Sequence, residues 1–349
     1  MLKIMGHTVQ EDGKIWLLSS AAEIGFRVTG ATKLLLKLEA DDTVQDPATE
    51  PLRPRFEVRL DGRKVLDIRM MSGETTVTVF EGEEKQNAEI RLIKLSECTQ
   101  SLMALRGIET DGETAPLPER PLKVEFIGDS ITCGYGVEGK SVDEPFTTAA
   151  ENAGKAYAFL TAEALNADAV LTSFSGYGIV SGYTEDPAIC NEDELVTKYY
   201  EKEGRNVFRL PSGRQVQDIP RDFSAFRPEY IVINLGTNDI SWCGTDNERG
   251  QLFAGKYAEF LKTVRKLNPR ARILCILGTM GTGLNQRLEQ AVNQYCRETG
   301  DREIWLMLLE EQNAARDGLG SYSHPSEITQ RLLAEKVMDG IRRWMKERN

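Results

Sequence analysis

Histidine is scarce in this sequence: His7 and His324 are the two copies among 349 residues. This scarcity argues against a metal centre built from several histidines, and it leaves few candidates for a base that works near neutral pH. Cysteine occurs six times, but no two cysteines have the CxxC spacing of a metal or redox motif. We therefore expect reduced thiols and neither a metal nor a cofactor.

Positive charge is also in deficit, since 43 Lys and Arg residues face 54 Asp and Glu residues, for a formal net charge of −11. Nucleic acids and anionic membranes bind a clustered positive face, so neither is expected as a partner. Long apolar runs are missing as well. None approaches the roughly 18 residues that span a bilayer, and the first residues lack the apolar stretch of a signal peptide. Together these absences predict a cytoplasmic protein.

The first third of the chain, residues 1–118, is predicted to be a β domain. Apolar residues alternate with polar ones, as at 34–38, which is the period of a half-buried strand. Asp61-Gly62 separates two such runs and predicts a tight hairpin. Many short strands with turns between them favour an antiparallel, jelly-roll-like β-sandwich, and the proline-rich, charged stretch 111–121 is the expected linker.

The remainder, residues 119–349, alternates near-continuous apolar runs with amphipathic helical segments. The runs predicted to be strands are 124–128, 169–174, 230–236, 272–278 and 303–309. This alternation predicts an α/β domain with a flavodoxin-like, doubly wound parallel sheet, in which ligands bind beyond the carboxyl ends of the strands. The polar stretch 183–227 fits neither pattern and is expected to form a lid, a rim, an oligomer contact or a disordered loop.

Four polar turns that contain glycine follow these predicted strands and should meet at one edge of the sheet. They are 128–132, 175–178, 236–239 and 320–325. A serine hydroxyl needs a base to become a nucleophile, and His324 is the one histidine in this part of the sequence. A tetrahedral oxyanion needs two or three fixed donors, and the Ser130 amide, the Gly176 amide and the Asn238 side chain are candidates. The set predicts acyl transfer with Ser130 as the nucleophile.

The blocks GDSIT, SGYG and GTND, with a late histidine before a C-terminal helix, resemble the SGNH (GDSL-type) hydrolase superfamily. The N-terminal β domain and the segments LIKLSECTQSLMALRGIETDG and FRPEYIVINLGTND narrow the resemblance to carbohydrate esterase family 2, over nearly the whole chain. The resemblance implies a serine esterase that removes O-acetyl groups from carbohydrates without a metal. It assigns Ser130 as nucleophile, His324 as base, and Ser130, Gly176 and Asn238 as oxyanion-hole residues.

The sequence departs from this family just before His324. The superfamily usually has an aspartate three residues before the histidine, and relatives often have one two before it, where this chain has Ser321 and Tyr322. Asp317 is the nearest upstream acid and would have to fold back to orient the imidazole. A backbone carbonyl in that role, which leaves a Ser–His dyad, is the favoured alternative. Ser323 stands where an aromatic residue often precedes the histidine, so the sugar contacts stay open.

Candidate substrate contacts are Trp242 and Tyr177, although a core position suits Trp242 equally well. The expected partner is a small acetylated oligosaccharide, and a homo-oligomer is compatible with the sequence. With an unperturbed imidazole, kcat/KM should rise with pH through an apparent pKa of ~6.5.

Three alternative functions stay open. One is an esterase or thioesterase of the same fold that acts on a non-sugar acyl group. Another is a carbohydrate-binding protein whose active site has decayed, because the usual aspartate is missing. The third is a nucleotide-binding protein, because residues 134–141 (GYGVEGKS) match the GxxxxGK[ST] pattern. The nucleotide reading is disfavoured because that motif does not follow a strand directly and no helical pattern begins at its Lys-Ser.

Overall fold

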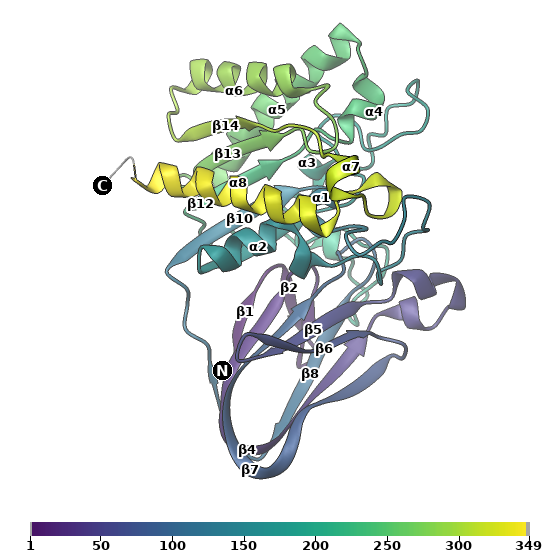
Figure 1. The fold of residues 1–349 in the computed structure, drawn as a ribbon, viewed down its shortest axis with the longest axis vertical. Helices are drawn as coiled ribbons and strands as arrows, with labels where there is room; N and C mark the ends of the chain where they lie inside the picture. Colours follow the sequence, from purple (N-terminus) through teal and green to yellow (C-terminus); the bar gives the residue numbers. More distant parts are fainter. Residues whose placement is uncertain (1, 347–349) are drawn as a thin grey trace.

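The computed structural model describes residues 2–346 and places a curled antiparallel sheet below a parallel sheet that is flanked by helices (Figure 1). The antiparallel sheet contains β1 (Lys3–Met5), β2 (Thr8–Glu11), β3 (Lys14–Leu17), β4 (Glu23–Ala40), β5 (Arg55–Leu60), β6 (Arg63–Arg69), β7 (Glu74–Lys94), β8 (Met103–Thr110) and β9 (Glu113–Pro116). Short 3-10 turns, η1 (Asp42–Val44) and η2 (Pro47–Leu52), follow β4.

The N-terminal sheet is built around two long strands, β4 and β7, which pair along most of their length. Their register shifts between Val28 and Leu35, and such bulges bend a strand and increase its twist. The sheet, in the order β2-β3-β8-β4-β7-β5-β6, therefore curls over its own apolar face, where Phe26, Leu36 and Phe56 are fully buried. The antiparallel β domain expected from the sequence is confirmed, although long bent strands build it where short ones were expected.

The Asp61-Gly62 hairpin is also confirmed. These two residues join β5 to β6 and both have positive φ angles, of 49° and 77°. A two-residue turn with positive φ at both positions matches the right-handed twist of the strands it connects.

The C-terminal part contains the parallel sheet and its helices. Its strands are β10 (Leu122–Gly128), β11 (Ala167–Ser173), β12 (Tyr230–Asn234), β13 (Arg272–Leu277) and β14 (Ile304–Leu308). The helices are α1 (Ser130–Cys133), α2 (Tyr157–Ala164), α3 (Val196–Tyr199), α4 (Asp239–Cys243), α5 (Asn247–Leu267), α6 (Asn285–Thr299), α7 (Ala314–Asp317) and α8 (Glu327–Lys346). The 3-10 turns are η3 (Ala153–Lys155), η4 (Val216–Asp218) and η5 (Ser321–Ser323). No helix within residues 2–346 is long and apolar enough to cross a bilayer.

The parallel sheet has the strand order β11-β10-β12-β13-β14, which confirms the flavodoxin-like topology. Side chains that alternate along β12 show that both faces are covered. Ile231 and Ile233 pack into a core with residues of α5 and α6, whereas Val232 packs with residues of α2 and α8. Figure 1 shows these two helix pairs on opposite faces of the sheet. Burial on both faces explains why the strands are almost continuously apolar.

The segment 183–227 is ordered and packs between the two sheets, so the disordered-loop alternative is wrong. It contains α3 and η4, and Tyr200 and Val216 are fully buried in the core. The segment also binds the N-terminal sheet. The Asn206 side chain donates a hydrogen bond to the Cys98 carbonyl, and the Ser212 hydroxyl donates to Glu11 Oε2 at 2.9 Å.

Candidate active site

Three of the four polar turns begin at the same level of the parallel sheet. Gly128, the last residue of β10, pairs with Ser173 at the end of β11 and with Asn234 at the end of β12. The turns that follow these neighbouring strands carry Ser130, Gly176 and Asn238. The carboxyl edge of the sheet is where a doubly wound fold binds its ligands.

The turn that carries Ser130 is closely packed. Asp129 caps α1 by accepting a hydrogen bond from the Ile131 amide at 3.0 Å, and Ser130 is the first residue of this short helix. Gly128 is required there, because a Cβ atom at this position would lie 2.0 Å from Thr132 Oγ1. Ser130 is buried except for 4% of its surface. The hydroxyl is therefore presented from a turn with little freedom to move.

His324 contacts Ser130 directly. Its Nε2 atom lies 2.9 Å from Ser130 Oγ, and its Nδ1 atom lies 3.1 Å from the carbonyl oxygen of Ser321. If Nδ1 carries the proton and donates it to that carbonyl, Nε2 is free to accept the serine proton. Asp317 lies elsewhere: its carboxylate forms a two-point ion pair with Arg316. A backbone carbonyl, and not Asp317, therefore orients the imidazole.

The loop before His324 has an unusual backbone. Tyr322 and Ser323 both have positive φ angles, 50° and 61°. Their strain is offset by hydrogen bonds from the Tyr322 amide to the Val142 carbonyl and from the His324 amide to the Ser321 carbonyl, at 3.0 and 3.1 Å. These contacts hold the Ser321 carbonyl where it meets the imidazole.

The glycine-rich segment 134–141 supports this loop. The Ser321 amide donates to the Gly136 carbonyl at 3.0 Å, and a Cβ atom on Gly139 would lie 2.0 Å from Ser321 Oγ. A phosphate-binding loop requires a helix that begins at its Lys-Ser pair, and within the described residues no helix begins at Lys140. The structure thus lacks the helix that the nucleotide-binding alternative needs at this point, and the glycines instead pack closely against the histidine loop.

Burial lowers the pKa of His324 to about 4, because the imidazolium loses hydrating water in this position. The backbone carbonyl at Nδ1 raises the pKa only partly, and no carboxylate contacts either ring nitrogen. This pKa lies below the ~6.5 of an unperturbed imidazole, from which the sequence-based expectation for kcat/KM is taken. His324 is neutral, and so able to accept a proton, throughout the physiological pH range.

Donors for an oxyanion lie on the neighbouring turns. The Asn238 Nδ2 atom donates to the Tyr177 carbonyl at 2.8 Å, which fixes the orientation of the amide and leaves its second N–H available. Within residues 2–346, neither the Ser130 amide nor the Gly176 amide has a protein acceptor. Gly176 has a φ of 86°, which side chains disfavour. Each of the three groups thus has an N–H without a protein acceptor within residues 2–346, and their role as oxyanion donors stays a prediction.

Two buried aspartates hold these turns in place. Asp239 accepts hydrogen bonds from the amides of Ile179, Val180 and Ser181, and so ties the loop after Gly176 to the turn that carries Asn238. Burial raises the pKa of Asp239 to about 6, and burial raises the pKa of Asp129 to about 7. Both carboxylates accept hydrogen bonds from backbone amides, which is typical of aspartates with a structural role.

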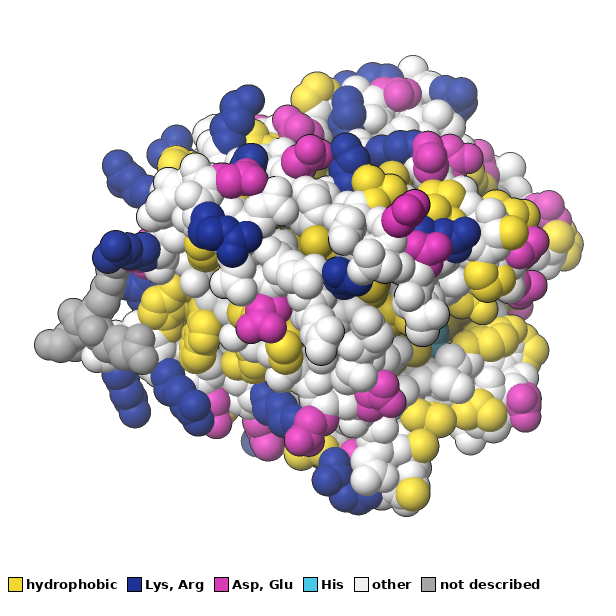
Figure 2. Space-filling view, turned by 90° about the horizontal axis from the view of Figure 1, so that it is seen from above, with side chains coloured by type: hydrophobic (Ala, Val, Ile, Leu, Met, Phe, Trp, Pro, Cys, Tyr) yellow, Lys and Arg dark blue, Asp and Glu magenta, His cyan; other side chains and the backbone are white. Residues whose placement is uncertain are grey.

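An aromatic wall beside His324 was missed in the sequence. The Tyr135 ring lies 4.5 Å from the imidazole, centroid to centroid, and is stacked on Phe146 at 4.0 Å. Tyr322, in the histidine loop, is 52% exposed. In the space-filling view, a histidine side chain is visible in a hollow bordered by hydrophobic side chains (Figure 2). The aromatic residues stand singly in the sequence, so no periodic pattern indicated that they gather here.

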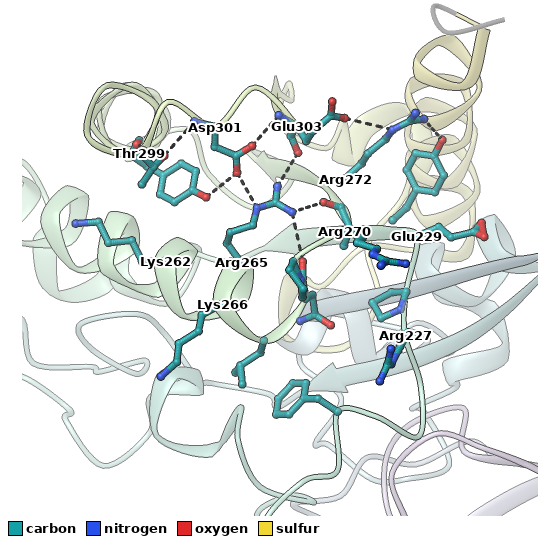
Figure 3. Close-up of a pocket in the computed structure, with 18 of the residues that line it drawn as sticks. Arg227, Glu229, Lys262, Arg265, Lys266, Arg270, Arg272, Thr299, Asp301 and Glu303 are labelled. Atoms are coloured by element: carbon teal, nitrogen blue, oxygen red, sulfur yellow. Dashed lines mark hydrogen bonds and ion pairs between the residues drawn. The ribbon is translucent and has the colours of Figure 1, made fainter.

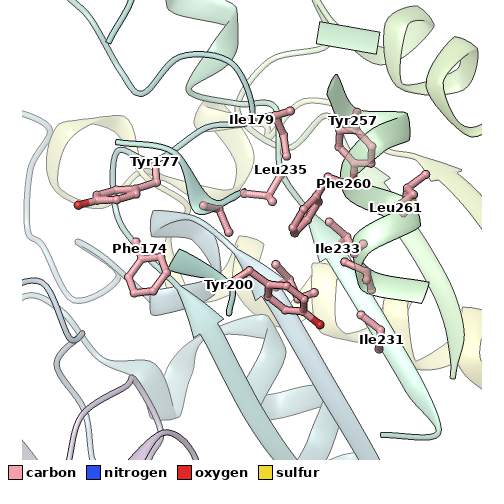
Figure 4. Packing of buried hydrophobic residues seen from close by; sticks show 14 of the residues in the cluster. Phe174, Tyr177, Ile179, Tyr200, Ile231, Ile233, Leu235, Tyr257, Phe260 and Leu261 are labelled. Carbon is pink, nitrogen blue, oxygen red and sulfur yellow. The ribbon is translucent and has the colours of Figure 1, made fainter. Parts of the chain in front are cut away.

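The two candidate substrate contacts are largely occupied by protein. Tyr177 is 5% exposed and packs on Phe174 at 5.3 Å, at the edge of the apolar cluster drawn in Figure 4. The Trp242 ring packs against the same cluster and is covered on one side by the Arg249 guanidinium, 4.7 Å from its centroid. A substrate-binding role for either residue stays a prediction.

A large cavity of about 1370 Å³ lies at the opposite edge of the sheet (Figure 3). It is lined by Tyr230 and Arg272, the first residues of β12 and β13. At its centre Arg265 pairs with Asp301 at 2.7 Å and donates to backbone carbonyls. Because Ser130 follows the carboxyl end of β10, this cavity is separate from the candidate active site.

Comparison with known proteins identifies the family. Residues 126–332, which contain Ser130, Gly176, Asn238 and His324, match the GDSL-like lipase/acylhydrolase family. The chain belongs to this family. Residues 4–119 match the carbohydrate esterase 2 N-terminal domain, so the GDSL-like hydrolase domain is preceded here by the β domain found in that group.

Several named proteins are similar in sequence to this GDSL-like protein. It is 31% identical to the cellulase/esterase CelE of Acetivibrio thermocellus over 82% of its own length and 34% of the relative. It is 29% identical to an acetylxylan esterase / glucomannan deacetylase of Cellvibrio japonicus, over 71% of its length and 67% of the relative. The chain thus spans about a third of the length of the first relative.

Its structure resembles that of a family two carbohydrate esterase from Clostridium thermocellum in complex with cellohexaose. The TM-score is 0.83, with 26% sequence identity and 99% of each chain covered. The agreement extends over both sheets.

Proposed function

We propose that this protein is a serine esterase that removes O-acetyl groups from carbohydrates, with Ser130 as nucleophile and His324 as general base. The observation that carries the proposal is the 2.9 Å contact between Ser130 Oγ and His324 Nε2, in a site where the Ser130 and Gly176 amides have no protein acceptor within residues 2–346. The names of the relatives, an acetylxylan esterase / glucomannan deacetylase among them, support the same chemistry.

The reaction follows from the positions of these groups. His324 Nε2 takes the Ser130 proton as Oγ attacks the acetyl carbonyl. The negative charge on the tetrahedral intermediate is stabilised by the Ser130 and Gly176 amides and by Asn238. As the intermediate collapses, the imidazolium returns the proton to the departing sugar hydroxyl. Water, activated by the same imidazole, then releases acetate from the acyl-enzyme.

A dyad suffices for this cycle because the Ser321 carbonyl fixes the ring. It accepts from Nδ1 at 3.1 Å and keeps Nε2 directed at the serine. A carbonyl carries only a partial charge, so it stabilises the imidazolium less than a carboxylate would. The low pKa of His324, about 4, agrees with this difference.

The substrate is proposed to be an acetylated oligosaccharide. A solved relative of the same fold binds cellohexaose, and Tyr135 and Tyr322 offer aromatic surface next to His324 for stacking on a sugar ring. Residues 1–118 are proposed as the accessory domain and 119–349 as the catalytic domain. The six cysteines, all free thiols, support action in a reducing compartment such as the cytoplasm.

The proposal is tested by the hydrolysis of 4-nitrophenyl acetate and of acetylated xylo-oligosaccharides by three variants. Ser130→Ala and His324→Ala should lower kcat by at least ~10³-fold. Ser72→Ala, which changes an exposed serine in the N-terminal sheet, should match the wild type. Equal slow rates for all of them, with sugar binding retained, would instead favour the decayed binding protein. Faster turnover of longer acyl esters than of sugar acetates would favour the non-sugar alternative.

A further inference from the structure

Glu97 is a fully buried carboxylate that reaches from the N-terminal sheet into the turn before Gly176. It lies in the loop between β7 and β8 and has no exposed surface. Its Oε2 atom accepts hydrogen bonds from the Ser175 amide at 2.8 Å and the Cys133 thiol at 3.4 Å. Its Oε1 atom accepts from the Gln100 side chain at 3.0 Å. The Glu97 carboxylate thus contacts both the turn that contains Gly176 and the last residue of α1.

The Ser175 contact restricts the turn that contains Gly176. The Ser175 amide belongs to the planar Phe174–Ser175 peptide, whose carbonyl accepts a hydrogen bond from the Tyr177 amide at 3.3 Å, so both ends of this peptide are held. The Gly176 amide that follows turns through the ψ angle of Ser175 and the φ angle of Gly176. Glycine at a φ of 86° resists this rotation less than any other residue. Anchoring the Phe174–Ser175 peptide on a buried oxygen therefore fixes the start of the turn and limits how far the Gly176 amide can be displaced.

The surroundings of Glu97 fit hydrogen bonding better than metal binding. Glu97, Cys133 and Glu151 bring atoms of ligand type within 4.8 Å of one another. However, both Glu97 oxygens are already occupied by N–H and S–H donors, and the Glu97 amide donates to Glu151 Oε2 at 3.1 Å. A cation at this position would have to displace the Ser175 contact.

We propose that Glu97 is a positioning residue for the oxyanion site, which acts by fixing the Phe174–Ser175 peptide that leads into the Gly176 turn. The N-terminal β domain thereby takes part in catalysis through a side chain that never touches substrate. This inference rests on the proposed esterase function. It gives the buried loop after β7 a positioning role, although no residue of that loop takes part in the proposed chemical steps.

The test compares two conservative variants of Glu97. One keeps the length of the side chain and removes its charge, and the other keeps the charge and shortens the side chain. Glu97→Gln keeps an oxygen in reach of the Ser175 amide, so kcat should stay within roughly 3-fold of the wild type. Glu97→Asp keeps the charge but withdraws it by one methylene, so kcat should fall roughly 30- to 100-fold while KM changes little. Gln100→Ala, which removes only the donor to the other oxygen, is the matched control and should leave kcat unchanged.

A second readout does not depend on turnover. Hydrogen exchange at the Ser175 amide should be roughly ten-fold faster in Glu97→Asp than in Glu97→Gln. Equal kcat values for the two variants, the reverse order, or a loss confined to KM would overturn the assignment. Ser130→Ala, measured in parallel, isolates the other failure: if it is as active as the wild type, the esterase function falls and the catalytic role of Glu97 falls with it.

Discussion

His324 works in this site without a carboxylate partner, and its surroundings set its basicity. The Ser321 carbonyl orients the ring, while burial lowers the pKa of the imidazole to about 4. A weaker base accepts the serine proton less readily, yet it stays unprotonated over a wider range of pH. The same burial that lowers the basicity of His324 therefore widens the pH range in which its ring is free to accept a proton.

The pH dependence of kcat/KM follows from this shift. Protonation disables His324 only when the pH falls toward about 4, so kcat/KM should be nearly flat from pH 6 to 8 and decline below pH 5. The measurement is a kcat/KM profile at constant ionic strength, with reassay at pH 7 to exclude unfolding in acid. A rising limb centred at ~6.5, the unperturbed value, would contradict the expected effect of burial.

Asn238 is expected to act in the transition state alone. Asn238→Ala removes an oriented N–H donor, so kcat should fall about 10²- to 10³-fold, equivalent to ~3–4 kcal/mol, with KM nearly unchanged. Steady-state kinetics on a sugar acetate measure this. Asn87→Ala, at an exposed position of β7, is the control. An increase in KM at constant kcat would show that Asn238 binds substrate and does not stabilise the oxyanion.

At the residue scale, the side chains of the candidate site could be predicted from the sequence, whereas the main-chain contact that orients His324 could not. Parallel strands align their carboxyl ends, so the positions of Ser130, Gly176 and Asn238 at one edge could be predicted from the order of strands and turns. The group that binds His324 Nδ1 could not be predicted in this way. It is a main-chain oxygen whose position depends on left-handed conformations at Tyr322 and Ser323, and neither residue type announces such a conformation.

Among the elements, the histidine loop depends on the glycine-rich segment 134–141. The sequence of that segment formally matches a phosphate-binding motif, whereas its glycines allow the backbone to approach Ser321 closely. One pattern can thus arise from two physical needs, because both a phosphate and a neighbouring backbone exclude side chains. The helix that follows a true phosphate loop separates the two cases.

Gly139→Ala should therefore lower activity through the histidine loop. The new Cβ atom would lie 2.0 Å from Ser321 Oγ and 2.4 Å from the Ser321 amide, so the carbonyl that orients His324 has to move. We expect kcat to fall by roughly ten-fold or more. Gly255→Ala in α5, where a Cβ meets nothing within 4 Å, is the control and should stabilise its helix slightly. Full activity of Gly139→Ala would show that the loop adapts.

The segment 183–227 could not be placed from its sequence. Its buried residues Val196, Tyr200 and Val216 are separated by polar stretches and show neither a helical nor a strand period. They are buried because the segment lies over the core of the parallel domain while Asn206 and Ser212 bind the N-terminal sheet. Contacts of this kind are set by tertiary packing, which periodicity does not encode.

For the molecule as a whole, a cluster of ion pairs joins the N-terminal sheet to helix α2 of the parallel domain. Arg91 of β7 binds Glu23 of β4 in two places, at 2.7 and 2.6 Å, and also binds Glu163 of α2 at 2.8 Å. Burial alone would lower the pKa of Arg91, but these carboxylates outweigh it and raise the pKa above the usual value. Burial would also raise the pKa of Glu163, yet Arg91 and Arg120 hold it at about 2.

Removing this junction should destabilise the protein. Arg91→Ala leaves the buried Glu23 carboxylate without its arginine and removes one of the arginines that bind Glu163, so the free energy of unfolding should fall by ~3–5 kcal/mol in urea titrations at pH 7. Arg27→Ala breaks an exposed pair with Glu89 and should cost below ~1 kcal/mol. Because the pKa of Glu163 is lowered, its contribution is complete above pH 4.5 and is lost as the pH falls toward 2. Equal effects of the two substitutions would contradict this account.

The carbonyl of Ser321 also has a genetic consequence. A main-chain oxygen is present whichever amino acid the codon specifies, so no single missense mutation deletes the group that orients His324. An aspartate in that role would be lost by almost any change of its codon. The Ser321 hydroxyl has no hydrogen-bond partner within residues 2–346, so small residues such as alanine should be tolerated there. Fewer single substitutions therefore remove the orienting group in a dyad of this kind than in a triad. Substitutions at position 321 can accumulate while the carbonyl that orients His324 is kept.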